Sequence, residues 1–257
     1  MKRILAQKWI KLINKQEMKD KIFRSKNKEI KSFEFNEEVA DVFPDMIERS
    51  VPGYKLLQSM IIVMAQKYVQ NNSNVYDLGC SLGETSFAIQ EIVDNEDVKI
   101  IAVDNSRAMI NKCIKNTKNI NRDIKIEFIM DDILKITIKN ASFVVMNFSL
   151  QFIPVDERDR LINKIFDGLA SGGVLILSEK IIFNDSDEDE IMISLHDKMK
   201  KINGYEESEI ANKRKSLEDV LIPEAIESHY ERLRNAGFRR SYTWLKCMNF
   251  ISIIAIK

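Results

Sequence analysis

Short apolar runs alternate with longer amphipathic stretches through the middle of the chain. The runs are rich in β-branched residues: NVYDLG (74–79), KIIAVDN (99–105), KIEFIMDD (125–132), SFVVMNFS (142–149) and GVLILSEK (173–180). Between them stand stretches with helical periodicity: ETSFAIQEIV, SRAMINKCIKNTKN and VDERDRLINKIFDGL. Strands that alternate with helices predict βαβ units and a parallel sheet that is buried on both faces.

The last third of the chain has a different pattern. The runs SYTWLKCMNF and ISIIAIK follow one another closely, as two antiparallel strands at a sheet edge would. A polar, helical stretch at about 181–222 separates them from the fifth strand. Before that strand, LASGGVLIL predicts a helix end, a glycine turn and a new strand. We therefore expect a single α/β domain over residues 33–257, with an inserted helical segment.

Composition narrows the possible functions. The chain has 257 residues, and Lys+Arg and Asp+Glu both number 39, so no overall charge favours a nucleic-acid partner. Cys80, Cys113 and Cys247 are odd in number and widely spaced. This pattern predicts no metal site, no disulfide framework and a reducing cytoplasm. No apolar run is long enough to cross a bilayer, so we expect no membrane partner for the α/β domain.

A basic segment, residues 1–32, precedes this domain. Residues 1–31 carry 11 basic and three acidic side chains. MKRILAQKWIKLINKQ starts like a signal peptide, but Lys8, Lys11 and Lys15 interrupt any apolar core. We expect an amphipathic helix that packs or is solvated, with membrane or RNA contact as the alternatives.

The stretch VYDLGCSLGETS (75–86) turns the first strand into a helix through two glycines, Gly79 and Gly83. Glycine lets backbone N–H groups approach a ligand at the position where a Cβ would collide with it. The strand-to-helix turn is where open α/β sheets bind ligands. The spacing D-x-G-x-x-x-G lacks one glycine of the dinucleotide fingerprint, so a pyrophosphate would have a poorer cradle.

Two further acidic positions follow at the next strand ends. Asp104 ends the second strand, where a carboxylate can accept both hydroxyls of a ribose. The pair Asp131–Asp132 ends the third strand, where a carboxylate can accept from an adenine amino group. Each acid alone could equally cap the following helix. Acids at three successive strand ends are more specific, and they predict a nucleoside that lies along the sheet edge.

Several stretches carry a resemblance to a known family: VADVFPDMIERSVPGY (39–54), VYDLGCSLG (75–83), AVDNSRAMI (102–110), MNFSLQF (146–152), LSEK (177–180), NGY (203–205) and KRKSLEDV (213–220). The strand pattern resembles the class I S-adenosyl-L-methionine-dependent methyltransferase fold. That fold is Rossmann-like, with helices on both faces of a mostly parallel, seven-stranded sheet and an antiparallel pair at its C-terminal edge. More narrowly, the motifs resemble the carboxy-S-adenosyl-L-methionine synthase family, from about residue 33 to the C-terminus but not over the first thirty residues.

The resemblance implies a reaction. Members of that family convert S-adenosyl-L-methionine and prephenate to carboxy-S-adenosyl-L-methionine and phenylpyruvate. A partner tRNA carboxymethyltransferase then modifies a wobble uridine with this product. The resemblance also implies a homodimer. A new carboxylate in a dry pocket needs a fixed cation, and the planar fork of arginine binds carboxylate in a bidentate manner.

The resemblance also assigns site residues. Arg214 matches the arginine that binds the transferred carboxyl group, and it is our candidate catalytic residue. The other expected ligand contacts are Tyr54 on the pocket wall, Gly79, Cys80 and Ser81 near the amino-acid part, Asp104 and Asn105 at the ribose, Asp132 and Ile133 at the adenine, and Asn147 near the sulfonium.

Other residues and functions stay open at this point. Arg49 could form an ion pair or contact a second prephenate carboxylate, and His196 could have a substrate role or a structural one. No residue stands out as a general base. Two other functions are compatible with the pattern: a conventional methyltransferase, and a non-catalytic module that binds S-adenosyl-L-methionine.

Overall fold

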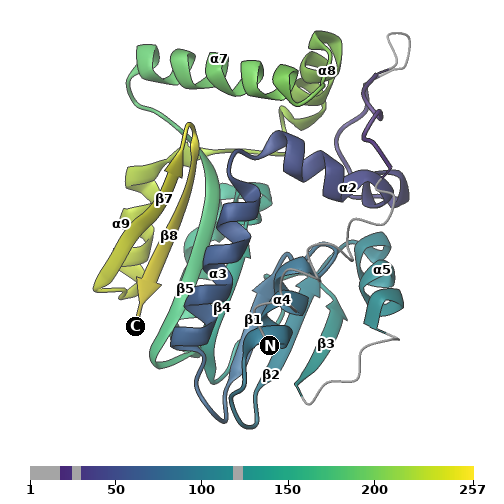
Figure 1. Cartoon of the computed structure of the whole chain (residues 1–257). Coiled ribbons are helices and arrows are strands. Elements are labelled where there is room, and N and C mark those ends of the chain that lie inside the picture. The colour runs from purple at the N-terminus through teal and green to yellow at the C-terminus, as the bar shows by residue number, and fades with distance from the viewer. Residues whose placement is uncertain (1–17, 25–29, 118–123) are drawn as a thin grey trace.

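The computed structural model describes residues 18–24, 30–117 and 124–257, and within them it contains one large mixed sheet (Figure 1). The strand order is β3-β2-β1-β4-β5-β8-β7, and the short β6 pairs with β5 off this path. The pairs from β3 to β5 are parallel, whereas β8 is antiparallel to both β5 and β7. The predicted fold class, with its antiparallel C-terminal pair, is confirmed.

The elements alternate as the hydrophobic pattern predicts. The strands are β1 Asn74–Leu78, β2 Lys99–Asp104, β3 Lys125–Met130, β4 Ala141–Asn147, β5 Leu169–Ile182, β6 Glu224–Ala225, β7 Arg240–Cys247 and β8 Phe250–Ile256. The helices are α2 Glu37–Ser50, α3 Tyr54–Tyr68, α4 Glu84–Ile92, α5 Arg107–Thr117, α6 Val155–Gly168, α7 Ser186–Ile202, α8 Glu207–Leu217 and α9 Ile226–Ala236, with a 3₁₀ turn η1 at Leu150–Phe152.

The fifth strand begins earlier than the sequence predicts. It starts at Leu169, directly after α6, and Gly172 adopts a φ of +73° inside it. Its pairing with β4 jumps from Ala141↔Leu169 to Phe143↔Val174. The expected glycine turn is therefore an irregularity within the strand, because the residues before it also pair with β4.

Both faces of the sheet are buried, as its parallel centre requires. Along β4, Phe143 and Val145 point into a cluster with α3 and α4, whereas Val144 and Met146 point into a cluster with α6 and α9. This alternation with a period of two follows from the pleat of a strand. Helices therefore cover the two faces, and only the ends of the strands are left to form a site.

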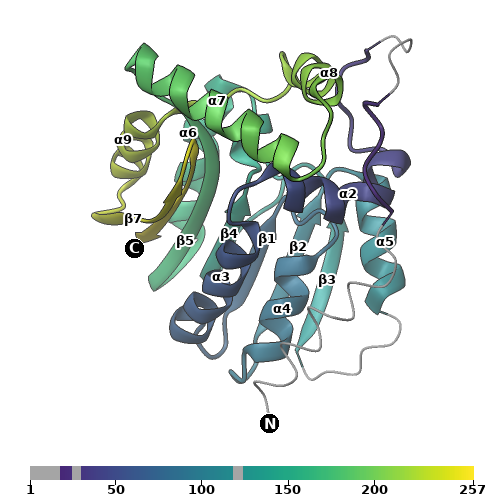
Figure 2. The ribbon, with the colours of Figure 1, turned by 45° about the horizontal axis from the view of Figure 1, so that its top comes forward.

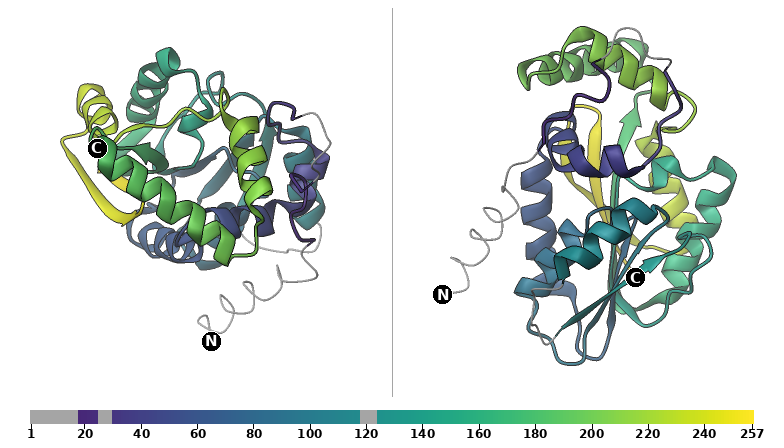
Figure 3. Two further views of the ribbon diagram at one scale, coloured as in Figure 1. Left: turned by 90° about the horizontal axis from the view of Figure 1, so that it is seen from above. Right: turned by 90° about the vertical axis from the view of Figure 1, so that its right-hand side faces the viewer.

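Helices α7 and α8 lie over the carboxyl ends of the strands, together with α2 (Figures 1 and 2). The view from above in Figure 3 shows them across the top of the sheet. His196 on α7 donates from Nε2 to the carbonyl of Ser50 at 2.7 Å, and Asn203 donates to the carbonyl of Arg49 at 3.0 Å. These bonds fix the roof, which we define as α7 and α8, to the end of α2.

The segment 18–24 ties the roof to α2 from a second side. Asp20 is only 2% exposed, and its backbone N–H donates to the Asp45 carboxylate at 2.7 Å. The hydroxyl of Tyr205, between α7 and α8, donates to the Asp20 carboxylate at 2.6 Å. Arg24 forms an ion pair of 2.6 Å with Glu206. The helix expected over residues 1–16 lies outside the described residues.

Within the described part of the chain, no helix combines the length and the apolar character needed to cross a membrane.

Candidate active site

A cavity of about 1380 Å³ lies between the carboxyl ends of the strands and the roof. Its walls include all ten site residues that the sequence predicts: Tyr54, Gly79, Cys80, Ser81, Asp104, Asn105, Asp132, Ile133, Asn147 and Arg214. These residues come from six different elements or loops, and the topology brings them to one place. Their contacts with a ligand stay predictions.

The glycine loop is shaped for a close approach of backbone groups. Gly79 has a φ of +79°, and a Cβ at this position would lie 2.8 Å from the Cβ of Ser149 and would also collide with its hydroxyl. Ser81 has a φ of +49°, so the loop turns through the left-handed region more than once. The Ser81 N–H donates to Asp104 at 2.8 Å, which fixes the loop against the end of β2.

The Asp104 carboxylate caps backbone N–H groups and also lines the cavity. Its two carboxylate oxygens accept from the backbone N–H groups of Ser81 and Ser106, each at 2.8 Å. Burial raises its pKa, and the two N–H donors oppose that rise. Each oxygen retains a lone pair that backbone bonding does not use, so capping and ribose binding are compatible at this residue.

Asp77, near the end of β1, is the first of the three strand-end acids in the sequence, and it also lines the cavity. It is 2% exposed and accepts from the hydroxyl of Ser86 at 2.6 Å. Burial raises its pKa to about 6. A cationic ligand in the cavity would favour its charged form.

A chain of hydrogen bonds positions Tyr54 and Asn147. Gln58 donates to the Tyr54 hydroxyl at 3.0 Å and accepts from Thr85 at 3.0 Å. Asn147 donates to the Thr85 hydroxyl at 3.4 Å and accepts from Ser178 at 2.9 Å. Burial raises the pKa of Tyr54, so its hydroxyl stays protonated. Gln58 and Thr85 therefore link the cavity wall at the start of α3 to the wall at the end of β4.

Arg214 faces the cavity from α8. Its Nη2 donates to Asp197 on α7, and its side chain is 58% exposed. Lys200 also donates to Asp197, at 3.1 Å. Nε and Nη1 of Arg214 have no hydrogen-bond partner among the described residues. The guanidinium is thus oriented by one carboxylate and still has donors for another.

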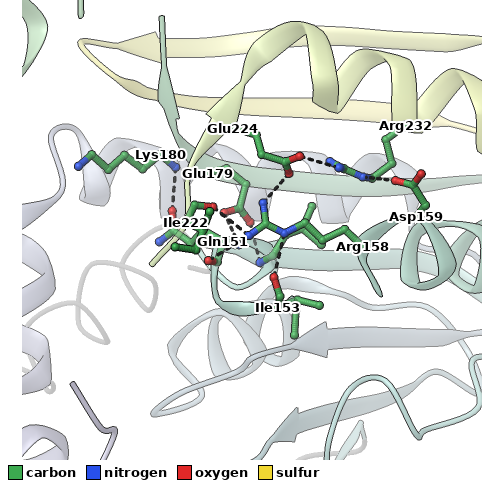
Figure 4. Close-up of polar contacts among 10 residues, drawn as sticks. Gln151, Ile153, Arg158, Asp159, Glu179, Lys180, Ile222, Glu224 and Arg232 are labelled. Carbon is green, nitrogen blue, oxygen red and sulfur yellow. Dashed lines mark hydrogen bonds and ion pairs between the residues drawn. The ribbon is translucent and has the colours of Figure 1, made fainter. Parts of the chain in front are cut away.

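Beneath the roof, Glu179 holds the turn that follows β4. Its two oxygens accept from the N–H groups of Leu150 and Gln151 at 2.9 and 3.0 Å. Burial raises its pKa to about 8. Beside it, the fully buried Arg158 donates to the carbonyl groups of Ile153 and Ile222, as Figure 4 shows.

Comparison with known proteins identifies the family. A methyltransferase-domain family model matches residues 75–173. The carboxy-S-adenosyl-L-methionine synthase of Pseudoalteromonas atlantica is 49% identical over 94% of this chain and 99% of its own length. That of Cronobacter sakazakii is 47% identical over 93% of this chain and 97% of its own length. The chain belongs to the carboxy-S-adenosyl-L-methionine synthase family.

Solved structures agree on the fold. An S-adenosyl-L-methionine-dependent methyltransferase of Methanococcus maripaludis is 22% identical, with a TM-score of 0.56 over 91% of this chain and 96% of that one. At this identity the likeness concerns the fold alone. It supports the class I methyltransferase architecture, on which the carboxy-S-adenosyl-L-methionine synthase family is built.

The family match corrects one expectation about the N-terminus. The Pseudoalteromonas synthase aligns over 242 residues, which is more than the stretch from residue 33 to the end contains. The match with the family therefore extends to the N-terminal side of residue 33, although about 15 residues of the chain lie outside the alignment. The burial of Asp20 against Tyr205 gives the physical reason, because this segment packs onto the domain instead of preceding it.

Two of the open residues have clear structural roles. The Arg49 guanidinium pairs with Asp45 and lies 3.9 Å from the centre of the Tyr205 ring, and it does not line the cavity. His196 lines the cavity, but burial lowers its pKa to about 3, so the ring is neutral with its proton on Nε2. Two lysines of the roof, Lys200 and Lys213, also line the cavity, and the sequence assigned a role to neither of them.

Proposed function

We propose that the chain uses prephenate as the carboxyl donor and converts S-adenosyl-L-methionine to carboxy-S-adenosyl-L-methionine, with phenylpyruvate as the second product. The observation that carries the proposal is Arg214. It presents unused guanidinium donors to the same cavity that the strand-end acids and Asn147 line. Family membership supports the adenosyl substrate and its carboxylated product.

The proposed reaction balances without an external oxidant or reductant. In prephenate, the bond between the ring and its carboxyl carbon breaks, and the electron pair makes the ring aromatic as the opposite hydroxyl leaves. The hydroxide takes one proton from the sulfonium methyl and becomes water. The methyl carbon then forms a bond to carbon dioxide. The donor thus supplies its own base, which fits a cavity where no general base stands out.

The residues of the chain would bind, orient and exclude water. We assign the ribose to Asp104 and Asn105, the adenine to Asp132 and Ile133, and the sulfonium end to Asn147. Tyr54 and the loop from Gly79 through Cys80 to Ser81 would enclose the amino-acid part. Arg214 would hold the carboxyl group, because a carboxylate in a dry cavity needs a fixed cation.

The product mass tests the function directly. Purified protein is incubated with S-adenosyl-L-methionine and prephenate, and adenosyl compounds are read by mass spectrometry. Carboxylation adds ~44 mass units to the sulfonium, and phenylpyruvate should form in equal amount. A conventional methyltransferase would make S-adenosylhomocysteine and ignore prephenate, and a binding module would make neither product. Absence of the carboxylated sulfonium would refute the proposal.

Asp104→Ala should weaken the binding of S-adenosyl-L-methionine by about 1–3 kcal/mol, because the ribose hydroxyls lose their acceptors. Calorimetry measures the affinity, and urea unfolding of the same variant measures the loss of the two backbone bonds. A fall in stability with unchanged affinity would show that Asp104 acts only as a cap.

We also propose a homodimer, in keeping with the family resemblance. Its support is the apolar surface of α7 around Ile191 and Leu195, which lie one helical turn apart and are 56% and 41% exposed. Light scattering should give twice the chain mass of 29.9 kDa. Leu195→Asp should shift the protein toward the single-chain mass, and a wild-type protein already at 29.9 kDa would contradict the proposal.

The carboxylated product would then be the carboxymethyl donor of a tRNA carboxymethyltransferase that modifies the wobble uridine. Direct contact of this chain with nucleic acid is not expected, given its balanced charge. The three cysteines are free thiols, in keeping with a cytoplasmic location.

A further inference from the structure

Charge is unevenly distributed around the cavity. Acidic residues gather at the ends of β1 to β3 and on α4: Asp77, Asp104, Asp132, Glu84 and Glu91. Basic residues gather on β5, α7 and α8: Lys180, Lys200, Lys213 and Arg214. The acidic side suits a cationic sulfonium ligand. The basic side, with its positive charges, suits an anionic ligand.

Lys180 is the basic cavity residue on β5, the strand that contacts Asn147, which we assign to the sulfonium end. It lies two positions after Ser178 on β5, on the same face of the strand, and Ser178 donates to Asn147 at 2.9 Å. Its side chain extends away from the Arg158 cluster in Figure 4. Its ammonium has no hydrogen bond or ion pair with any described residue. Burial lowers its pKa, the charges of Lys200 and Arg214 lower it further, and the charges of Asp197 and Asp189 oppose the shift.

The other two lysines, Lys200 and Lys213, add positive charge to the same cavity. Lys213 donates to the Ser50 hydroxyl at 3.0 Å, and within the described residues no carboxylate lies at ion-pair distance from it. Burial lowers its pKa to about 8. Lys200 shares the single carboxylate of Asp197 with Arg214. Lys200 and Arg214 thus share one directly bonded acid, whereas Lys180 has only longer-range interactions with Asp197 and Asp189, and Lys213 only with Asp20 and Asp45. A buried charge without a direct partner is costly unless a ligand compensates it.

Two other acids that line the cavity, Glu209 and Glu218, do not change this charge balance. Glu209 on α8 lines the cavity, but its carboxylate accepts from the Glu206 N–H at 2.8 Å in the cap of its own helix. Glu218 lines the cavity edge and is exposed to solvent.

We propose that Lys180, Lys200 and Lys213 form a second anion subsite beside Arg214, which binds the 2-oxo carboxylate that the carboxyl donor retains. The inference rests on the proposed function only for the identity of the donor. A donor with two carboxylates needs two different contacts. Arg214 meets the group that is transferred, and the lysines hold the group that stays with the leaving product.

The two kinds of cation fit the two tasks. The guanidinium fork of Arg214 fixes the plane of the carboxylate that moves to the methyl carbon. Lysine ammonium groups are point charges with rotatable donors, so they can bind a carboxylate and the adjacent oxo group in more than one orientation. The subsite therefore anchors the donor without restricting the ring as it becomes aromatic.

Lys180→Met and Lys213→Met test the subsite, because methionine keeps much of the side-chain volume and removes the charge. Each should raise the KM for prephenate about tenfold or more. The affinity for S-adenosyl-L-methionine should stay within about twofold of wild type. Lys215→Met is the matched control: it lies on α8 next to Arg214, is exposed and does not line the cavity. An unchanged KM in both variants would overturn the subsite.

Phenylpyruvate separates the two anion contacts, because it keeps the 2-oxo carboxylate and lacks the transferred group. Its inhibition constant against prephenate should rise about tenfold in Lys180→Met and stay unchanged in Arg214→Ala. The opposite pattern would refute the assignment. If Lys180→Met instead loses affinity for S-adenosyl-L-methionine, the lysine binds the methionine carboxylate and the proposal is wrong.

The subsite and the function can fail separately. Wild-type protein that forms carboxylated product, with no effect of the lysine variants, refutes the subsite alone. If wild-type protein forms no such product, the proposed function fails. Calorimetric titration of phenylpyruvate into protein saturated with S-adenosyl-L-methionine then decides the subsite: binding that Lys180→Met weakens supports it, and absence of binding refutes it.

Discussion

Arg214→Ala should weaken the binding of carboxy-S-adenosyl-L-methionine by about tenfold to more than a hundredfold and leave the binding of S-adenosyl-L-methionine unchanged. A charge-assisted hydrogen bond to a carboxylate contributes about 1.5–3 kcal/mol, and only the carboxylated ligand makes one here. The residues that we assign to the adenosyl group line the other side of the cavity, and the substitution does not change them. Calorimetry with both ligands measures the difference, and the synthesis rate with prephenate should fall with it.

Two further variants sharpen this result. Arg214→Lys should recover only part of the affinity, because an ammonium lacks the planar fork. Arg234→Ala, on the exposed side of α9, is the control and should behave like wild type. Full synthesis and full product affinity in Arg214→Ala would show that the carboxylate lies elsewhere in the cavity.

Arg158→Met should lower the free energy of unfolding by about 3–5 kcal/mol, the cost of breaking a buried ion pair from one side. Arg158 is fully buried and pairs with Glu224, and it also donates to the carbonyl groups of Ile153 and Ile222, both at 2.9 Å. Methionine fills the space but satisfies none of these acceptors. Urea unfolding should show a lower midpoint with an unchanged slope.

Arg160→Met provides a matched control on the same helix. Its ion pair with Glu157 is exposed, with 60% of the arginine side chain accessible. Exposed pairs of this kind contribute about 0–1 kcal/mol, so the control should lose little stability. Equal losses in the two variants would mean that Arg158 does not hold the loop around Ile222 to α6.

The sheet could be predicted because each of its strands is recognised from a short segment of the sequence. The central parallel strands β1 and β4 are buried on both faces, so they stand out as apolar runs, and chain order then places Asp104 and Asp132 at the same edge. The contacts of Arg158 were not predictable in this way. The stretch VDERDR is typical of a solvated helix, and the partner Glu224 is 66 residues distant in sequence.

The roof shows a second limit of sequence patterns. Helices α7 and α8 carry charges on several faces, and periodicity does not tell which face turns toward a cavity. Lys200 and Lys213 therefore resemble solvated lysines in the sequence, although they line the site. Arg214 could be singled out only by family resemblance, because its orientation depends on Asp197 across the interhelical turn.

The tie between Asp20 and Tyr205 has a consequence for how the protein is made. The two residues are 185 positions apart, so at ribosomal rates of about 5–20 residues per second Asp20 waits roughly 10–40 s for its partner to be synthesised. The strand-end half of the cavity, from Tyr54 to Asn147, is translated well before that. On the ribosome, the residues of the strand-end side are therefore available before those of the roof, and the strands β7 and β8, which complete the sheet, are made after both.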